Sequence, residues 1–355
     1  MWRSAKRLAL GLVLIFFTSS ILLLSDLDRR KPRADGVSSH AYFSTKKKWK
    51  VYLIQYNDVL DVKESERGVR EGLREAGLEE GRDYTTKLLN AQGDMATVSA
   101  LIDAAVTGGA DLLITFSTPT LQAAIQRGQS LPIVFTYVAN GLVAGAGRSE
   151  TDHLPNVTGV NLAPASEEML VLIRTWFPSI RRVGTLFVPS EVNMVYLLDQ
   201  FTRTAKKHGI EVVALPVSTA TDVPDAAAAL TSRHIDAICQ IPGNLTASAF
   251  GSINHAAIGA GLPVFAFQRQ QAADGALVVL ARDYEESGRE SGALAARVMR
   301  GEDPAQIPLE WFSKTSMVVN LDAARELGIQ LPAELVRAAN DVPGKADGSH
   351  QATAR

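Results

Sequence analysis

Residues 110–138 read ADLLITFSTPTLQAAIQRGQSLPIVFTYV, and this stretch decides the fold class. A short apolar run is followed by a segment that opens with Thr118 and Pro119, and a second apolar run follows Leu131 and Pro132. Short apolar strands that alternate with helical segments are typical of parallel strands joined by crossovers. The stretch therefore predicts a strand, a helix and a strand within a parallel sheet that is buried on both faces.

The chain repeats this plan. One copy opens with KWKVYLIQYND (48–58), and the other opens with RRVGTLFVPSE (181–191). In the second copy, IDAICQI (235–241) and LPVFAF (262–267) take the places of the two apolar runs. Right-handed crossovers between parallel strands give a doubly wound sheet. We therefore predict an α/β protein with two doubly wound parallel-sheet lobes joined by a hinge.

The predicted boundaries follow from where the pattern stops and resumes. A basic start and the apolar run from Leu8 to Leu24 indicate a signal anchor or a signal peptide, with cleavage left open. A long following domain favours translocation, so we expect a periplasmic or other extracytoplasmic protein, anchored by its N-terminal helix. The expected segments are the leader at 1–28, a tether at 29–48, lobe 1 at 49–160 plus 282–310, lobe 2 at 161–281 plus 311–340, and a disordered tail at 341–355.

Composition and motifs exclude several function classes. The net charge of -2 provides no bulk attraction to nucleic acid. The single cysteine, Cys239, excludes a disulfide framework and a multi-cysteine zinc site, and its apolar surroundings indicate a buried strand residue. The motifs HExxH, GxxxxGK[ST] and GxSxG do not occur in the sequence. We expect no enzyme activity, no catalytic residues, no cofactor and no metal.

A doubly wound sheet places its ligand outside the carboxyl ends of its strands, and polar residues stand at those ends here. Thr118, Ser190 and Asn244 are expected to cap helices whose N-termini would favour a carboxylate, although each cap also stabilises its own helix by about 1 kcal/mol. Aromatic side chains could stack on a ligand or pack in the core. Glu191 and Asp283 could neutralise an ammonium group or stay solvated. The candidate ligand-binding residues are Tyr56, Asn57, Asp58, Ser117, Thr118, Tyr137, Asn140, Glu191, Asn193, Asn244, Gln268 and Asp283.

Several stretches together resemble one known family. They include DLLITFSTPTLQAA, LPIVFTYVAN, LPNVTGVN, RRVGTLFVPSEVN and ARDYEESGRESGALAARVMRGEDPAQIPLE, and they occur in order from about Lys48 to Asp341. The chain resembles the ABC-transporter substrate-binding family that includes tryptophan-binding proteins, within the type I periplasmic-binding-protein superfamily. This resemblance implies a hinged, two-lobed protein that hands a solute, often an aromatic amino acid, to a membrane permease. By the same resemblance, Ser117 and Thr118 are expected to bind the ligand carboxylate.

The sequence departs from the family pattern at several positions, and two alternative functions are considered. Gly68 follows Asp61 at a longer spacing than in the family pattern, and Asn140 and Gln268 stand where aspartates are common. We expect a monomer that binds an amino acid or a related small carboxylate and docks on an ABC permease. The first alternative is a membrane-anchored sensory receptor with the same ligand-binding fold. The second is an enzyme of similar shape, although a two-thiol racemase would need a second cysteine.

Overall fold

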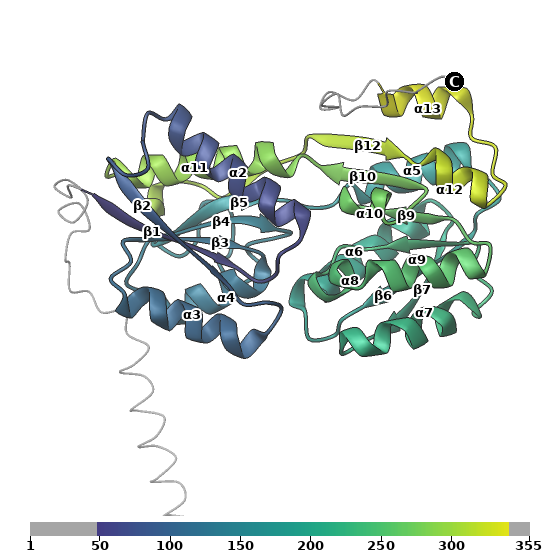
Figure 1. Cartoon of the computed structure of the whole chain (residues 1–355), viewed down its shortest axis with the longest axis horizontal. Coiled ribbons are helices and arrows are strands. Elements are labelled where there is room, and N and C mark those ends of the chain that lie inside the picture. The colour runs from purple at the N-terminus through teal and green to yellow at the C-terminus, as the bar shows by residue number, and fades with distance from the viewer. Residues whose placement is uncertain (1–47, 341–355) are drawn as a thin grey trace, which may run out of the picture. The chain divides into compact units, whose positions relative to one another are not determined.

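The computed structural model describes residues 48–340 (Figure 1). The predicted leader, nearly all of the tether and the tail lie outside the described residues. Within 48–340, no helix is both long enough and apolar enough to cross a membrane.

The first sheet belongs to what we call lobe 1. Its strands lie in the order β11-β5-β4-β3-β1-β2, and every neighbouring pair is parallel. Helices α2 and α11 cover one face of this sheet, and α3 and α4 cover the other (Figure 1). The bounds are β1 (Trp49–Gln55), α2 (Leu60–Glu75), β2 (Tyr84–Asn90), α3 (Met95–Thr107), β3 (Leu112–Phe116), α4 (Thr118–Arg127), β4 (Ile133–Val138), β5 (Val157–Asn161), α11 (Tyr284–Met299) and β11 (Glu310–Trp311).

The second sheet belongs to lobe 2. Its strands lie in the order β12-β10-β9-β8-β6-β7, and all neighbours are parallel except β10 and β12. The bounds are α5 (Ser166–Trp176), β6 (Arg182–Phe187), α6 (Val192–Lys207), β7 (Glu211–Pro216), α7 (Val223–Thr231), β8 (Ala237–Gln240), α8 (Asn244–Ser248), α9 (Phe250–Gly259), β9 (Val264–Ala266), α10 (Gln270–Ala273), β10 (Val278–Arg282), β12 (Thr315–Val319), α12 (Leu321–Glu326) and α13 (Ala333–Asn340). The prediction of two α/β lobes with parallel sheets is confirmed.

The central strands are buried on both faces, as their apolar sequences predict. Every residue of β3 is buried, which requires helices on both sides of the sheet. Cys239 lies in β8 with no exposed surface, and burial raises the pKa of its thiol well above the usual range. The prediction of a buried strand cysteine is therefore confirmed.

The helix pair α2 and α11 packs backbone against backbone at glycines. A Cβ atom on Gly68 would lie 1.9 Å from the carbonyl oxygen of Glu285, and one on Gly292 would lie 2.3 Å from the carbonyl oxygen of Val69. Only glycine permits this close approach. Because α11 follows β10 of lobe 2 directly along the chain, this packing fixes the start of α11 where the chain returns to lobe 1.

Candidate ligand-binding site

A small cavity lies where strand ends of both lobes meet. Its volume is about 50 Å³, measured as space open to the centres of water-sized molecules. At about 10–15 Å³ for one water on this measure, it has room for a few waters only. The lining residues are Ser117, Thr118, Tyr137, Ala139, Leu162, Pro164, Asn193, Leu197, Pro242, Gly243, Asn244, Gln268, Arg282 and Tyr284.

Hydrogen bonds join the two lobes across this cavity. The Gln268 amide donates to the Tyr137 hydroxyl oxygen at 2.6 Å, and the Asn57 amide donates to the carbonyl oxygen of Asn244 at 3.4 Å. The hydroxyl of Tyr284 donates to the carbonyl oxygen of Phe267 at 3.1 Å. The two strand-end edges are therefore in direct contact, with little space left between them.

Several buried polar atoms at the cavity have no hydrogen-bond partner. Ser117 Oγ and Asn193 Oδ1 belong to lining residues from opposite lobes, and Asn57 Oδ1 lies beside them at the contact with Asn244. An unsatisfied buried polar group costs about 1–3 kcal/mol. A ligand that carries both hydrogen-bond donors and acceptors would remove this cost.

The start of α4 differs from its predicted form. Thr118 was expected to be the N-cap, but it is the first helical residue, and Ser117 occupies the cap position without a side-chain cap bond. The backbone of Ser117 has a φ of 97° and a ψ of 158°, which differ from the extended conformation usual at an N-cap. Such a conformation is costly for a residue with a Cβ atom and is found mainly at functional sites. The free N–H groups and positive dipole end of α4 therefore lie at the cavity.

The caps predicted in lobe 2 are also wrong. Helix α6 begins at Val192, beyond Ser190, and Asn244 is the first residue of α8, after Gly243 in the cap position. Neither helix has a side-chain bond from its cap residue. Instead Glu191 reaches across and accepts bonds from the backbone N–H groups of Asn244 (2.9 Å) and Leu245 (3.1 Å), and from the Asn244 amide (2.9 Å).

The remaining candidates make bonds elsewhere. Tyr56 donates its hydroxyl to the carbonyl oxygen of Gly93 at 2.6 Å, and Asn140 Oδ1 accepts from the backbone N–H of Leu142 at 2.9 Å. Asp58 is exposed and pairs with Lys63 at 3.1 Å.

Asp283 caps α11 by accepting from the backbone N–H of Glu286 at 3.0 Å, and it pairs with Lys314 at 3.1 Å. Of the twelve candidates, the structure therefore brings six together as cavity-lining residues: Ser117, Thr118, Tyr137, Asn193, Asn244 and Gln268. Asn57 lies at their edge, and Tyr56, Asp58, Asn140, Glu191 and Asp283 are not among the lining residues.

Two lining residues lie where the chain crosses between the lobes and were missed. Arg282 is 8% exposed and donates to the carbonyl oxygens of Ala163 (2.7 Å) and Ser313 (2.6 Å), and also to the Thr315 hydroxyl. The ring of Tyr284 lies 5.3 Å from the ring of Tyr137, tilted by 58°. The sequence offered a signal for both, because they flank Asp283 at the end of an apolar run.

A third missed residue, Asp61, lies in the first turn of α2. It is 1% exposed, and its Oδ1 has no hydrogen-bond partner. Burial raises the pKa of this carboxyl to about 8, and the nearby Glu64 adds to the rise, while the Gln268 amide and Arg269 lower it. Burial also raises the pKa values of Tyr137 and Tyr284 well above the usual range, and Asp61 contributes to both shifts. Asp61 is therefore electrostatically coupled to the wall of the cavity.

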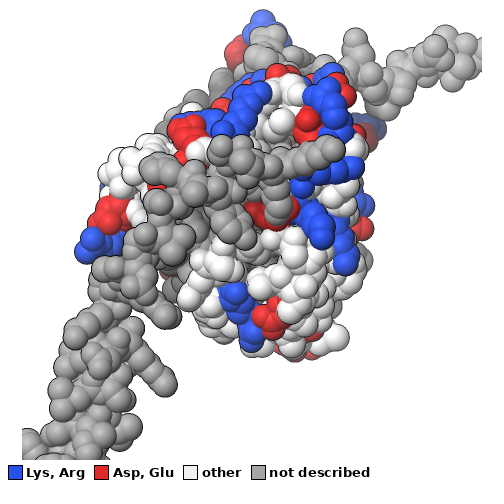
Figure 2. Space-filling model, turned by 90° about the vertical axis from the view of Figure 1, so that its left-hand side faces the viewer, with Lys and Arg blue, Asp and Glu red and all other residues white. Residues whose placement is uncertain are grey.

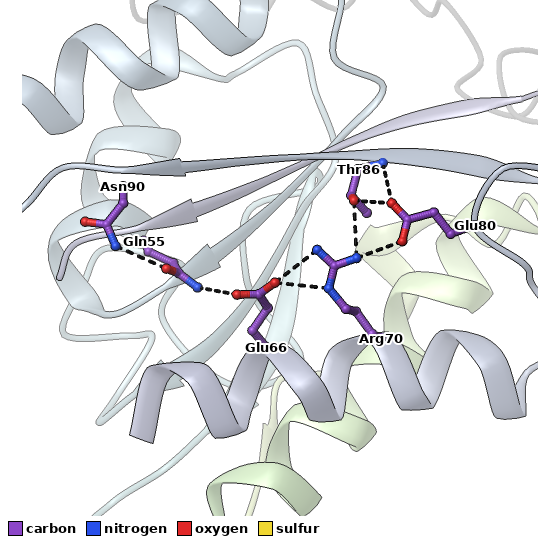
Figure 3. A network of polar contacts seen from close by, with 6 residues as sticks. All are labelled: Gln55, Glu66, Arg70, Glu80, Thr86 and Asn90. Carbon is purple, nitrogen blue, oxygen red and sulfur yellow. Dashed lines mark hydrogen bonds and ion pairs between the residues drawn. The ribbon is translucent and has the colours of Figure 1, made fainter. Parts of the chain in front are cut away.

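A polar network holds the loop that contains Asn57. The Asn90 amide donates to the Asn57 carbonyl oxygen at 3.0 Å. It also donates to Gln55 Oε1 at 3.1 Å, and Gln55 donates to Glu66 at 2.8 Å (Figure 3). Arg70 then bonds Glu66 at 3.0 Å and continues the network to Glu80 and Thr86. Helix α2 thus fixes the carboxyl end of β1 at the cleft.

The surface shown in Figure 2 carries charges of both signs. Basic and acidic side chains lie next to one another over its described part, in line with ion pairs such as Arg70–Glu80 at 2.8 Å and Arg289–Glu75 at 3.3 Å. This face therefore offers no single-sign surface for a polyanion within the described residues.

Two parallel-sheet lobes that meet at their strand ends over a polar cavity define a two-lobed ligand-binding protein of the type I periplasmic-binding kind. Residues 51–343 match the family model described as "ABC transporter substrate binding protein", and the chain belongs to that family. This confirms the family resemblance. The family is one of solute-binding proteins and not of enzymes, and such proteins work outside the cytoplasm.

Relatives and solved structures agree with this assignment. A tyrosine-binding protein of Clostridioides difficile is 28% identical over 81% of this chain and 83% of its own length. An ABC domain from Streptococcus pneumoniae, solved with L-Trp, has a TM-score of 0.79 at 24% identity, covering 82% of this chain and 98% of that chain. A ligand-free, open substrate-binding protein with adhesive properties from Clostridium difficile has a TM-score of 0.64 at 26% identity, covering 80% and 96%.

Proposed function

We propose that the protein is the extracytoplasmic solute-binding component of an ABC importer and binds an aromatic L-amino acid between its lobes. The observation that carries this proposal is the pair of unpartnered buried atoms, Ser117 Oγ and Asn193 Oδ1, which belong to residues that line one cavity from opposite lobes. A single small polar ligand can satisfy both only when it touches both lobes. Such a ligand stabilises the arrangement in which the lobes are close together.

The lining chemistry supports an aromatic amino acid. The N-terminus of α4 and the guanidinium of Arg282 suit a carboxylate. Tyr137 and Tyr284 offer aromatic surface, which suits an aromatic side chain. The tyrosine-binding relative, at 28% identity over most of both chains, supports the same ligand class.

Hinge opening is the second part of the proposal. A cavity with room for a few waters cannot admit an amino acid, so the bonds from Gln268 to Tyr137 and from Asn57 to Asn244 must break on ligand entry. The lower TM-score to the open relative, despite slightly higher identity, supports a closed arrangement here. A ligand-dependent difference of a few kcal/mol between open and closed forms is sufficient for such a change.

The third part of the proposal concerns the membrane anchor and the permease partner. The apolar run from Leu8 to Leu24 supports an N-terminal membrane anchor, with the lobes delivering solute to a permease of the same transporter.

Titration calorimetry with L-tyrosine, L-tryptophan, L-phenylalanine and L-alanine tests the ligand class. We expect at least one aromatic amino acid to bind at micromolar concentration or below and alanine to bind much more weakly. Small-angle scattering with and without the bound amino acid tests hinge motion, and a smaller radius of gyration is expected with ligand. The ligand assignment is wrong if no aromatic amino acid binds, and the hinge assignment is wrong if the scattering profile stays the same on binding.

A further inference from the structure

Asp61 is a buried carboxyl that the lobes' own contacts satisfy only in part. It belongs to α2 of lobe 1, is 1% exposed, and leaves Oδ1 without a partner. Across the cleft, the Gln268 side chain and the backbone N–H of Arg269 in lobe 2 hydrogen-bond to this carboxyl. An unpaired buried carboxylate is costly, because burial removes the water that stabilises its charge.

The charges around Asp61 do not offset its own. Glu64, one turn further along α2, adds negative charge, and Arg269 is the cation that acts on the carboxyl from lobe 2. Arg269 also acts on Glu64 and donates to the Ser316 hydroxyl at 3.2 Å. Tyr137 in β4 and Tyr284 in α11 have neutral hydroxyls, and the charge of Asp61 contributes to the raised pKa of each. Arg282 acts on Tyr284, and its Nε and Nη1 donate to backbone carbonyl oxygens at the crossing between the lobes.

Asp61 does not line the cavity, but it interacts with residues that do. Tyr137, Gln268 and Tyr284 all line the cavity, and all interact with the Asp61 carboxyl. The bond between Gln268 and Tyr137 closes this layer, and ligand entry must break it. An amino group placed against these side chains would reach the electrostatic field of Asp61.

The other carboxylates near the cleft are already committed. Glu191 accepts bonds from the start of α8, Asp283 caps α11 and pairs with Lys314, and Asp58 is exposed beside Lys63. Among the described residues, the cavity lining itself contains no aspartate or glutamate. An ammonium group in the cavity would therefore have Asp61, whose Oδ1 has no partner, as its available negative partner.

We propose that Asp61 is the counter-charge for the ammonium group of the ligand and makes the site select amino acids over the corresponding desamino acids. This inference rests on the proposed binding of an aromatic amino acid. When the ammonium group binds, Asp61 is charged and the pair is neutral. When a desamino acid binds, Asp61 gives no attraction. The site therefore discriminates by charge as well as by shape.

Paired ligands test the proposal. Dissociation constants are measured by calorimetry for L-tyrosine and for 3-(4-hydroxyphenyl)propionate, and likewise for tryptophan and phenylalanine with their desamino acids. The wild-type chain should prefer the amino acid. In Asp61→Asn, the amino acid should bind about 10- to 100-fold more weakly, as expected for a lost hydrogen bond or ion pair to a charged group, while the desamino acid changes little.

Two further variants distinguish a specific effect of the Asp61 charge from a loss of folding. Asp61→Glu retains the charge and should keep a preference for the amino acid, although affinity for both ligands can fall. Asp103→Asn makes the same chemical change at an exposed site paired with Arg127, and it should leave both affinities unchanged. The proposal is wrong if the ratio of the two dissociation constants is the same in the wild type and Asp61→Asn, or if Asp61→Glu loses the preference completely.

The outcomes separate this inference from the proposed function. If aromatic amino acids bind but the ratio does not depend on residue 61, only the role of Asp61 is refuted. If no aromatic amino acid binds to the wild-type chain, the ligand class fails first, and the counter-charge role fails with it.

Discussion

The two lobes share a strand order but differ in what they present at the cleft. In lobe 1, Ser117 and Tyr137 hold left-handed φ angles of 97° and 55°, and Asn57 and Asp61 each leave a buried oxygen without a partner. In lobe 2, by contrast, side chains satisfy the strand-end loops from within. Gln271 Oε1 accepts from the backbone N–H of Gln268 at 3.0 Å, for example.

This difference indicates a division of labour. Strain and unsatisfied polar atoms concentrate where a ligand or a catalytic step must complete the structure. In lobe 2, Glu191 and Gln271 complete the loops, and the unpartnered buried atoms at the cleft are Asn193 Oδ1 and Arg269 Nε. We therefore expect lobe 1 to provide most of the ligand's polar contacts and lobe 2 to close over it as a preformed surface.

The largest effect is expected in lobe 1, where helices α2 and α11 pack closely against each other. Gly68→Ala places a Cβ atom against the backbone of α11, 1.9 Å from the Glu285 oxygen, so the two helices must separate. We expect the free energy of unfolding to fall by about 3 kcal/mol or more, as for severe overpacking. Ligand affinity should fall too, because Tyr284 at the start of α11 lines the cavity. Urea unfolding and calorimetry measure the two effects.

The matched control lies in lobe 2. Gly251 is in α9, and a Cβ atom there meets nothing within 4 Å. Gly251→Ala should leave binding unchanged and raise the free energy of unfolding by about 0.5–1 kcal/mol, because alanine favours a helix over glycine. If the two variants changed the free energy of unfolding and the ligand affinity equally, lobe 1 would not depend on the close packing of α2 against α11.

The next effect concerns lobe 2. Glu191→Ala removes the acceptor for the backbone N–H groups of Asn244 and Leu245. We expect the free energy of unfolding to fall by about 2 kcal/mol, within the range for hydrogen bonds to a charged group, and affinity to fall because Asn244 moves. Glu211→Ala removes an exposed carboxylate paired with Arg182 and should change neither quantity much. Unchanged affinity in Glu191→Ala would mean that the closing surface of lobe 2 does not depend on this bond.

Much of the fold could be predicted from the sequence, because its signals are local. The apolar run before Ser117 and the one before Asn140 are buried strands whatever packs on them, since a strand of that composition needs cover on both faces. Once these strands are identified, the residues at their carboxyl ends can be read directly from the sequence. Six of the predicted residues line the cavity for this reason, since the end of a parallel strand fixes where the next residues lie.

The residues that could not be predicted depend on contacts distant in sequence. Asp61 lies in a helix whose apolar period is clear only from Glu66 onward, and it hydrogen-bonds with Gln268 in the other lobe. Arg282 lines the cavity because three crossing segments meet there. The strain at Ser117 leaves no mark on the sequence, because serine before a Thr-Pro helix start looks like an ordinary turn residue.

The pH dependence of stability tests the same difference between the lobes through the sign of the change. Asp61 has a pKa of about 8 in the folded protein, against 3.8 for an ordinary aspartate, so the folded chain holds one more proton than the unfolded chain between these values. A native state that binds more protons loses stability as pH rises. Relative to Asp61→Asn, the free energy of unfolding of the wild type should fall from about pH 4 to about pH 8 and then level off.

Opening of the lobes limits the size of this effect, because water can reach the carboxyl before the fold is lost. Urea unfolding of both proteins at several pH values measures it. A difference between the two proteins that is constant over this range would show that Asp61 is solvated in the ligand-free protein.

The smallest effect separates strain from function at the edge of lobe 1. Ser117→Gly relieves a φ of 97°, and Gln92→Gly relieves a φ of 54° in an exposed turn. Both should raise the free energy of unfolding by up to about 1 kcal/mol, since the relieved strain of about 1–3 kcal/mol is partly offset by the greater chain entropy of glycine. Only Ser117→Gly should weaken ligand binding, by about threefold to tenfold, the value of one neutral hydrogen bond. Equal affinities of the two variants would mean that the Ser117 hydroxyl does not contact the ligand, and the polar contacts would then have to come more evenly from both lobes.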